Sequence, residues 1–490
     1  MNYSNTRLLK ACVYAVMLAF GAGSATAQIV LSNFNSGTAA GAVKAGTSWV
    51  GNTTQNATTL TVGGTAKDDN GFGVTGLNLN ASSMTYVRIT AQRDAGNVNP
   101  SFVVAFEDPS LNSAIFSVGS AAFAVGTLTQ VQIPIASWGA GFDPTQIAGW
   151  NIGGGSVGTT AFRMTIDNLA LSSSLLPLTG GGTIITAGSQ VYTSAVTLDA
   201  ATTLESIGSN GNAITFNSTI DGTQNLTLNT PGTTTLTGAV GNTTPLGNLT
   251  LDAGGTTAIN GGAVKTTGAQ TYNDPVFLGA NTLFESISGG VISFSQALTG
   301  NGGSLEIRTS GASSFKSASG LSSFTKSGSG TLTLTGGSTY TGMTTIAAGT
   351  VALGLSYALP STSALTLGGG TLALNGFSQS LGLLSVTSSS FVSFGSGATL
   401  TFANSSAQSW TGTLTISNYN TATNSLRFGI TSSDLTGLQL TSIRFADYGN
   451  VFGQIDSSGF ITPSAIPEPS TYAAIFGAAA LGFAVWRRRR

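Results

Sequence analysis

Between residues 176 and 463, one short pattern returns many times: two or three alternating Thr and Leu residues, then glycine, asparagine or aspartate. Runs such as NLTLNTPGTTTLTGAV, GNLTLDAGGTTAING and GTLTLTGG alternate apolar and small polar side chains. That alternation has the period of a β-strand, and the residues that end each run favour turns. A strand this short cannot bury its apolar side alone, so the pattern predicts many strands stacked against one another.

A longer repeat lies inside this region. QVYTSAVTLDAATTLESI begins at Gln190 and QTYNDPVFLGANTLFESI begins at Gln270, and the same offset pairs Glu205 with Glu285. Repeats of this kind are typical of stacked units. We predict a parallel β-helix, or β-solenoid, over residues 176–463, with coils of about 20–25 residues and about a dozen coils. The alternative is a flexible low-complexity stalk, which the regular apolar alternation disfavours.

Composition supports an all-β chain and excludes several functions. Of the 490 residues only 7% are charged, 41% are hydrophobic and 67 are glycine. The net charge is −1 and histidine is absent. Nucleic-acid binding is therefore not expected, because it needs a basic surface. The chain also lacks the commonest general base and metal ligand.

Residues 28–175 have a different texture from the repeats. Runs such as YVRITAQ, SFVVAFED and TQVQIPIASW read as separate strands joined by Gly, Asn, Pro or Asp. We predict a β-sandwich, jelly-roll-like, over this region. Its three tryptophans, Trp49, Trp138 and Trp150, either pack in the core or form a platform for sugar rings.

The N-terminus, residues 1–27, has the three parts of a secretory signal peptide. Two basic residues precede the apolar run 11–20, and Ala25 and Ala27 form a small-residue cleavage site before Gln28. A buried N-terminal helix is the alternative. Cys12, the chain's one cysteine, lies in this segment, so the secreted chain is expected to contain no disulfide.

The C-terminus, residues 464–490, reads PEPSTYAAIFGAAALGFAVWRRRR from Pro467 onward. The apolar run 472–486 is shorter than the roughly 20 residues of a comfortable transmembrane helix, yet a locally thinned bilayer would accommodate it. Four terminal arginines, Arg487, Arg488, Arg489 and Arg490, would stay in the cytoplasm by the positive-inside rule. The stretch before the tail is richer in charge and aromatics, as expected for a closing cap of the solenoid.

Three parts of the chain resemble known families. GSGTLTLTGGSTYTGMTTIAAGTVALG, residues 328–354, is similar to the autotransporter-associated β-strand repeat, whose passenger domains are parallel β-helices. The longer repeat that begins at Gln190 and Gln270 more loosely resembles repeats of large bacterial surface adhesins. The tail resembles the PEP-CTERM sorting signal, with Pro467, Glu468 and Pro469 as the motif, then the apolar segment, then the arginines.

The sorting-signal resemblance implies a processing partner and a location. An exosortase-type membrane enzyme is expected to act near Pro467–Pro469, after residues 471–486 have transiently anchored the chain in the inner membrane. Such systems belong to Gram-negative bacteria that produce exopolysaccharide, so the resemblance implies a secreted or cell-surface protein and polysaccharide as a partner. A plain C-terminal anchor remains the alternative.

The first domain resembles jelly-roll carbohydrate-binding modules, most of all in FRMTIDNLALS, residues 162–172. In such modules an aspartate near the last strand helps to hold a structural Ca²⁺, and Asp167 has that place. The resemblance makes Asp167 the candidate metal ligand. No other cofactor is expected.

We expect no catalysis. A lyase or glycosidase on a β-helix needs acids that converge on one sugar. The acids of residues 176–463 are scattered and lie mostly in turns, where Asp serves the backbone. We expect Asp252, Asp274 and Glu306 to lie apart and solvated. The sequence therefore predicts a structural or adhesive surface protein, with a glycan-binding protein acting through the sandwich as the alternative.

Overall fold

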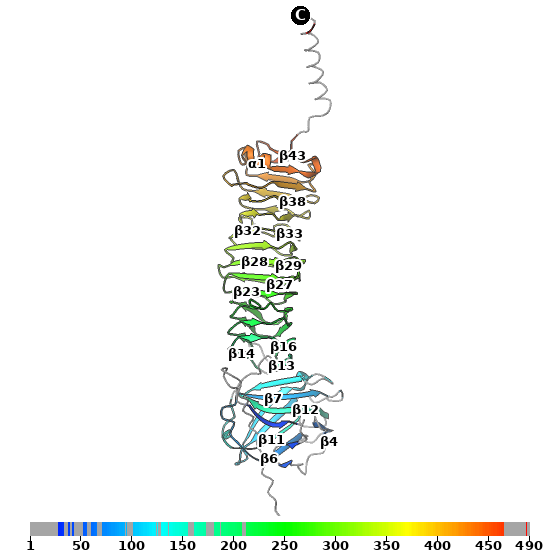
Figure 1. Ribbon diagram of the computed structural model, residues 1–490, viewed down its shortest axis with the longest axis vertical. Coiled ribbons are helices and arrows are strands. Elements are labelled where there is room, and N and C mark those ends of the chain that lie inside the picture. The colour runs from blue at the N-terminus through cyan, green and yellow to red at the C-terminus, as the bar shows by residue number, and fades with distance from the viewer. Residues whose placement is uncertain are drawn as a thin grey trace, which may run out of the picture. The chain divides into compact units, whose positions relative to one another are not determined.

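The computed structural model describes residues 28–33, 38–39, 42–43, 52–55, 60–65, 71–93, 95, 101–123, 125, 129–135, 137–154, 161–172, 181–186, 188–207, 212–464 and 487. It divides into two compact units, Met1–Gly261 and Gly262–Arg490 (Figure 1).

The first unit begins with two antiparallel sheets that share one core. One sheet contains β1 (Gln28–Asn33), β2 (Thr38–Ala39), β4 (Asn52–Gln55), β5 (Leu60–Thr65), β7 (Tyr86–Arg93), β10 (Thr129–Pro134) and β12 (Ala161–Ser172). The other has the order β3 (Ala42–Val43), β6 (Gly71–Leu79), β11 (Ile147–Gly154), β8 (Ser101–Glu107) and β9 (Ser113–Gly119), and η2 (Ser120–Ala122) follows β9. Side chains from both sheets fill the core, such as Ile89 and Leu169 from one and Phe102, Phe106 and Trp150 from the other. Two antiparallel sheets thus contribute to one core, as the predicted β-sandwich requires.

The chain then changes from antiparallel to parallel pairing. β13 (Gly182–Thr186) pairs in parallel with β10, with Ile184 opposite Gln130. The strands that follow stack as β13, β16 (Thr202–Ser206), β19 (Leu226–Asn229) and β21 (Leu249–Leu251), and as β14 (Gln190–Tyr192), β17 (Ile214–Phe216), β20 (Thr233–Leu236) and β22 (Thr256–Ile259). β15 (Val196–Thr197) and β18 (Ile220–Asp221) form a third, shorter pair. Along the first stack the successive partners are Gly182, Thr202, Leu226 and Leu249, so each coil has the length expected from the sequence.

The second unit repeats this parallel stacking over many coils. One wall consists of β24 (Gln270–Tyr272), β27 (Ile292–Gly300), β29 (Ser313–Ser319), β31 (Thr331–Leu334), β33 (Thr350–Leu353), β35 (Thr371–Ala373), β38 (Ser390–Ser393), β40 (Leu414–Ser417) and β42 (Ile443–Phe445). A second wall consists of β23 (Ala263–Thr266), β26 (Thr282–Ser286), β28 (Ser304–Thr309), β30 (Ser323–Ser327), β32 (Met343–Ile346), β34 (Leu365–Leu367) and β37 (Leu384–Val386). The remaining strands are β25 (Val276–Leu278), which pairs with β27, and the stack β36 (Gln379–Ser380), β39 (Thr399–Phe402) and β41 (Ser425–Phe428). The predicted β-solenoid is confirmed.

Alternation along each strand sends one set of side chains into the solenoid. In β19 and β21 the leucines Leu226, Leu228, Leu249 and Leu251 are at most 1% exposed, while the threonines between them are half-buried. Burial of each aliphatic side chain contributes about 1.5–3 kcal/mol. On the outer face hydroxyls pair along the stack, as between Thr233 and Thr256, whose Oγ1 atoms are 3.0 Å apart.

The second unit ends in a cap that departs from the parallel pattern. It contains α1 (Gly437–Ser442), β42, η3 (Ala446–Tyr448), β43 (Val451–Ile455) and β44 (Ile461–Pro463). α1 begins with a capping box: the hydroxyl of Thr436 accepts from Gln439 N, and the Gln439 side chain accepts from Thr436 N. β43 pairs antiparallel with both β42 and β44, which closes the end of the stack.

Candidate functional site

The residues of the predicted processing sites lie mostly outside the described part of the chain. Ala25 and Ala27 lie outside it, and so do Pro467, Glu468, Pro469 and the arginines Arg488–Arg490. Gln28 is the first residue of β1 and lies opposite Ser172 of β12. Arg487, the one tail residue that is described, is exposed. Among the residues that are described, the structure contains no helix long and apolar enough to cross a bilayer.

Asp167 lies in β12 at an irregularity of the sheet. The register between β12 and β7 shifts between Ile166 and Asn168, so Asp167 occupies a β-bulge. Its side chain is outside the described set. Over the described ranges, no three His, Cys, Asp or Glu side chains come together as a group that could hold a metal ion. Calcium binding by Asp167 remains a prediction.

Several carboxylates of the solenoid accept hydrogen bonds from backbone amides, as their turn positions predicted. Asp221 Oδ1 accepts from Thr243 N at 2.9 Å and Thr244 N at 3.0 Å, one coil further along. Asp434 Oδ2 accepts from Ile430 N at 2.7 Å and Thr431 N at 2.6 Å, and these amides hold the pKa of Asp434 below its usual range. A carboxylate used in this way stabilises a turn.

Glu205 and Asp252 are the acids whose environment most resembles that of reactive carboxyls. Glu205 pairs with Asn229 of the next coil. Asp252 lies in the coil after that, at the same position in the stack. Two strand spacings therefore separate Glu205 from Asp252, about 10 Å. Burial raises the pKa of both groups, and the nearby Asp252 raises that of Glu205 further. The backbone amides of Thr230 and Gly254 bond the Asp252 carboxylate, which fixes it in its own turn.

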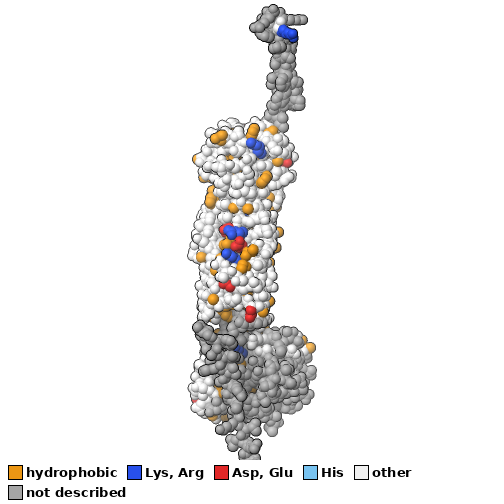
Figure 2. All heavy atoms as spheres, in the orientation of Figure 1, with side chains coloured by type: hydrophobic (Ala, Val, Ile, Leu, Met, Phe, Trp, Pro, Cys, Tyr) orange, Lys and Arg blue, Asp and Glu red, His pale blue; other side chains and the backbone are white. Residues whose placement is uncertain are grey.

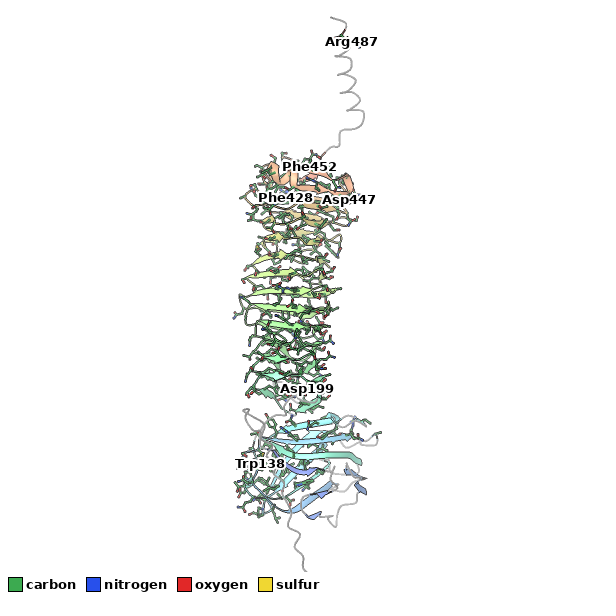
Figure 3. The ribbon with its side chains drawn as sticks, in the orientation of Figure 1. Trp138, Asp199, Phe428, Asp447, Phe452 and Arg487 are labelled. Atoms are coloured by element: carbon green, nitrogen blue, oxygen red, sulfur yellow. The ribbon has the colours of Figure 1, made fainter. Side chains whose placement is uncertain are left out.

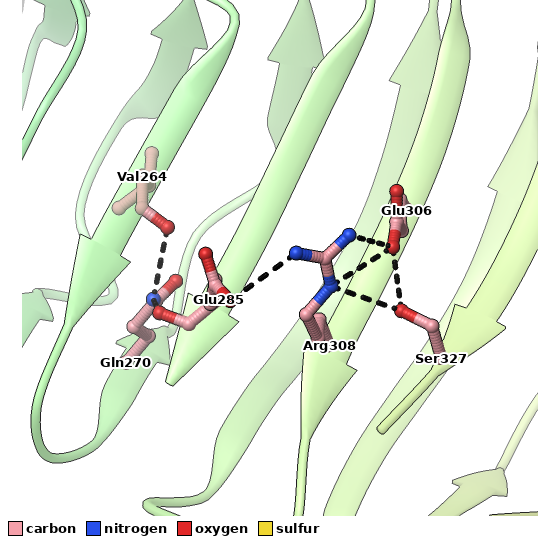
Figure 4. Close-up of polar contacts among 6 residues, drawn as sticks. All are labelled: Val264, Gln270, Glu285, Glu306, Arg308 and Ser327. Atoms are coloured by element: carbon pink, nitrogen blue, oxygen red, sulfur yellow. Dashed lines mark hydrogen bonds and ion pairs between the residues drawn. The ribbon is translucent and has the colours of Figure 1, made fainter. Parts of the chain in front are cut away.

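The prediction that Asp274 is solvated was wrong: its side chain is 1% exposed. Glu306, also expected to be solvated, lies half-buried in a charged ladder on the outer face of the β26–β28–β30 wall (Figure 4). Arg308 Nη2 lies 2.7 Å from Glu306 Oε1, and Arg308 Nη1 lies 3.3 Å from Glu285 Oε1. Ser327 Oγ donates to Glu306 at 2.5 Å. One guanidinium is thus shared by two carboxylates on the neighbouring strands β26 and β28, and the hydrogen bond from Ser327 extends the ladder to β30.

Charged side chains are sparse on the surface of the solenoid. Figure 2 shows red and blue side chains gathered together on a surface that is otherwise mostly uncharged. Partly exposed ion pairs of this kind contribute little stability, about 1 kcal/mol or less, but their register is specific. The ladder therefore favours the correct pairing of neighbouring coils over a slipped one.

The two described tryptophans of this region, Trp138 and Trp150, do not form a common platform. Trp150 is 2% exposed in the core, which overturns that alternative for this residue. Trp138 is partly exposed, stacks on Phe142 with ring centroids 5.5 Å apart, and meets Phe106 and Phe116 edge-on. Trp49 is outside the described residues.

Two buried polar features escaped sequence reasoning. Gln190 Nε2 donates to Glu205 O at 2.8 Å, and Gln270 Nε2 donates to Glu285 O at 2.8 Å. In each repeat the tyrosine two residues on, Tyr192 or Tyr272, donates its hydroxyl to the glutamine Oε1. Gln-x-Tyr at the same place in both copies was the available signal, because residues two apart in a strand share one face.

The second feature is Lys326, which is fully buried. It occupies the inward row of the β28–β30–β32 wall between Ile307 and Ile346. Its Nζ donates to Ser327 O at 2.8 Å and Gly328 O at 2.7 Å. Burial lowers the pKa of Lys326 to about 8.

Comparison with known proteins identifies two segments. A family model described as the Passenger-associated-transport-repeat matches residues 324–353, and one described as the PEP-CTERM protein-sorting motif matches residues 465–490. The predicted resemblances of residues 328–354 and of the C-terminal tail are confirmed. The chain thus carries a sorting motif of secreted, exosortase-processed surface proteins of Gram-negative bacteria.

The wider comparisons add little. No curated protein matches the chain. Among solved structures, an agarase, AgWH50C, aligns with a TM-score of 0.24 and 12% identity over 31% of this chain. The alignment covers 25% of the agarase chain, and a similarity at this level carries no functional argument.

Proposed function

We propose that the chain is a structural or adhesive protein of the cell surface, exported by its signal peptide and associated with exopolysaccharide or the envelope. The observation that carries the proposal is the match of residues 465–490 to the PEP-CTERM protein-sorting motif. The passenger-type repeat and the parallel coils support it, because passenger domains are displayed outside the cell.

The outer surface of the solenoid suits many weak contacts. Along the β31–β33–β35 wall the register aligns Thr331, Thr350 and Thr371, and in the next coil Phe391 follows them. Rows of hydroxyls with an occasional exposed aromatic, such as Phe391 at 46%, offer hydrogen bonds and stacking to neutral sugars. Each contact is weak, and repetition along the stack supplies avidity.

The tail would act in three parts. Residues 471–486 enter the inner membrane, Arg487–Arg490 keep the end in the cytoplasm, and Pro467–Pro469 are read by an exosortase-type enzyme on the outer side. Intact-mass measurement of the secreted protein tests this step. We expect loss of the residues after about Pro469, whereas a full-length secreted species would contradict processing.

Fractionation of cells tests the destination. The parent chain is compared with a chain that ends at Ile466 and with one in which Pro467, Glu468 and Pro469 are replaced by alanine. We expect the parent at the surface or in the medium, the alanine variant in the inner membrane, and the truncated chain soluble in the periplasm. Equal distribution of all three would refute the sorting role.

No catalytic role is part of the proposal. The carboxylates Asp221, Asp252 and Asp434 are bonded to backbone amides, and Glu306 is paired with Arg308. Incubation of the secreted protein with the exopolysaccharide of its own producer should leave the polymer's size distribution unchanged. A fall in polymer length would refute this part.

A glycan-binding protein acting through the sandwich is the second candidate. The partly exposed Trp138, stacked on Phe142, favours it. Because β10 pairs with β13, the sandwich shares a sheet with the first coil, so the full chain is the proper sample. If the sandwich is the binding site, Trp138→Ala weakens retention on matrix glycan and Phe391→Ala does not. The reverse result places binding on the solenoid.

A further inference from the structure

The β43–β44 hairpin of the cap has an inner and an outer face. Gly453 and Ile461 are buried on the inner face. The register places Gln454 opposite Thr462 on the outer face. Phe452 precedes Gln454 by two residues and Phe460 precedes Thr462 by two. Because residues two apart in a strand share a face, both phenylalanines lie on the outer face. Phe452 is 47% exposed and Phe460 39%. Figure 3 shows Phe452 in the cap.

An arginine accompanies each of these two rings. Arg444, opposite Phe452 in the β42–β43 pair, holds its guanidinium carbon 4.1 Å from the ring centroid of Phe452. Arg427 bridges to Phe460 and lies 5.3 Å from that ring centroid. These distances are those of cation–π contacts.

Two aliphatic side chains extend the same region. Leu438 is 82% exposed on α1, which packs against β43, and Ile430 is 70% exposed. Phe428 N donates to Gly459 O at 2.9 Å, which brings the loop with Ile430 beside Phe460. We call Arg427, Ile430, Leu438, Arg444, Phe452 and Phe460 the end face.

The acids near the end face are engaged elsewhere. Asp456 Oδ1 accepts from Ser458 N at 2.8 Å and Phe460 N at 2.9 Å. Asp447 Oδ2 accepts from Tyr419 N at 2.9 Å. The two arginines also bond backbone carbonyls, Arg427 Nε to Ser458 O and Arg444 Nη1 to Ile443 O, both at 3.2 Å, and they keep their positive charge beside the two rings.

The chain leaves the cap directly beside this surface. Ser464 N donates to Phe452 O at 2.9 Å, so the last described residue of the cap is fixed at the edge of the end face. Residues 465–471 separate it from the apolar run 472–486. Fully extended, this short segment reaches about 24 Å. An inserted tail would thus hold the end face within that distance of the bilayer.

We propose that the end face rests on the lipid headgroup region of the membrane that the tail enters, an inference that depends on the proposed function. Aromatic and aliphatic side chains flanked by arginine are the typical composition of interfacial contacts. The short tether gives the contact a high effective concentration, so shallow insertion of two phenylalanines suffices. The contact holds Pro467–Pro469 at the membrane surface, where a membrane-embedded enzyme must read them.

Site-specific depth measurement tests the proposal on the full chain. In a Cys12→Ser background, Gln454→Cys on the outer face or Thr345→Cys on β32 carries an environment-sensitive fluorophore. The protein is reconstituted, without other proteins, into vesicles of phosphatidylethanolamine and phosphatidylglycerol. We expect at least twofold stronger quenching at position 454 than at position 345 by lipids that carry a spin label near the headgroup. Adding Phe452→Ser and Phe460→Ser should reduce quenching at position 454 to the level at 345, with unchanged flotation and circular dichroism.

Each other outcome contradicts the proposal in its own way. Vesicles that float with bound protein but quench both positions equally overturn the end-face contact and leave the membrane step of the proposed function intact. Protein that does not float overturns that membrane step, and the end-face proposal with it. Quenching at position 454 that requires an added exosortase-type enzyme assigns the surface to a protein partner instead.

Discussion

Lys326 allows one prediction to be worked through in numbers. Its side chain is 0% exposed between Ile307 and Ile346, and its amine bonds two main-chain carbonyls, Ser327 O and Gly328 O. Lys326→Ala removes three buried methylenes, about 2.4 kcal/mol at about 0.8 kcal/mol each, and leaves two carbonyls without a donor. With the cavity, the free energy of unfolding should fall by about 4 kcal/mol.

The pH dependence distinguishes a buried amine from a merely bulky side chain. Burial lowers the pKa of Lys326 to about 8, against about 10.4 in an unfolded chain. Between these values the unfolded state binds more protons than the folded state, so stability rises with pH. From pH 7.5 to pH 9 the gain should be about 1 kcal/mol. Lys326→Met fills a similar volume without an ionisable group, so it should lose this gain.

Urea unfolding followed by circular dichroism at both pH values measures the effect. The difference between the parent and Lys326→Met isolates the amine, because all tyrosines titrate alike in the two proteins. Lys316→Met, at an exposed lysine bonded to Gln296, serves as the surface control and should behave as the parent. An equal pH response of the parent and Lys326→Met would refute the assignment of Lys326 as a buried amine.

Further predictions concern buried hydrogen bonds, one turn glycine and one carboxylate that bonds its own loop. Gln270→Leu should lower the free energy of unfolding by about 2 kcal/mol, because Val264 O and Glu285 O lose their shared donor, and Tyr272→Phe should lower it by about 1 kcal/mol; both are read from urea midpoints. Gly255→Ala should prevent folding of the coil around it, since Gly255 has φ +87° and a Cβ would overlap the Gly232 carbonyl oxygen; loss of the β-sheet circular dichroism signal checks this. Because backbone amides hold the pKa of Asp434 low, its contribution is present above the ordinary Asp pKa of about 3.9 and is lost as pH falls through the folded value. Asp434→Asn should flatten that acid transition in a pH-dependent melting series.

The strand alternation predicted most of the fold. Leucines two apart, such as Leu226 and Leu228, were expected inside the solenoid and are buried there. The coil length was predicted from the same pattern, because the chain must complete one turn of the solenoid before its next strand can pair with the previous one in the same wall. The register of the first unit, which pairs Gly182 with Thr202 and Leu226 with Leu249, agrees with that expectation.

The buried polar side chains were not predicted. At these positions the residue type suggests an outward side chain, whereas the strand alternation suggests an inward one. Lys326 is charged and so suggests an outward position, yet it is two residues from the buried Phe324 and shares its face. Asp274 was expected to be solvated, and it is buried. The partners that make such burial tolerable are carbonyls of adjacent turns, as for Lys326, and a sequence does not show where those carbonyls point.

The placement of these polar groups follows from what a solenoid lacks. Each coil touches only its two neighbours, and the secreted chain is expected to have no cysteine to link them. Apolar rows alone would let one coil slip along another by two residues, because inward leucines would still pack against inward leucines of the next coil. Gln270 bonds the carbonyl of Glu285, and Gln190 bonds that of Glu205, so each glutamine makes its full set of hydrogen bonds only in the observed register. A slipped coil would break this bond at a cost of about 0.5–1.5 kcal/mol, although Gln270 would keep its bond to Val264 O. The inward amides therefore fix the register that the apolar rows leave open.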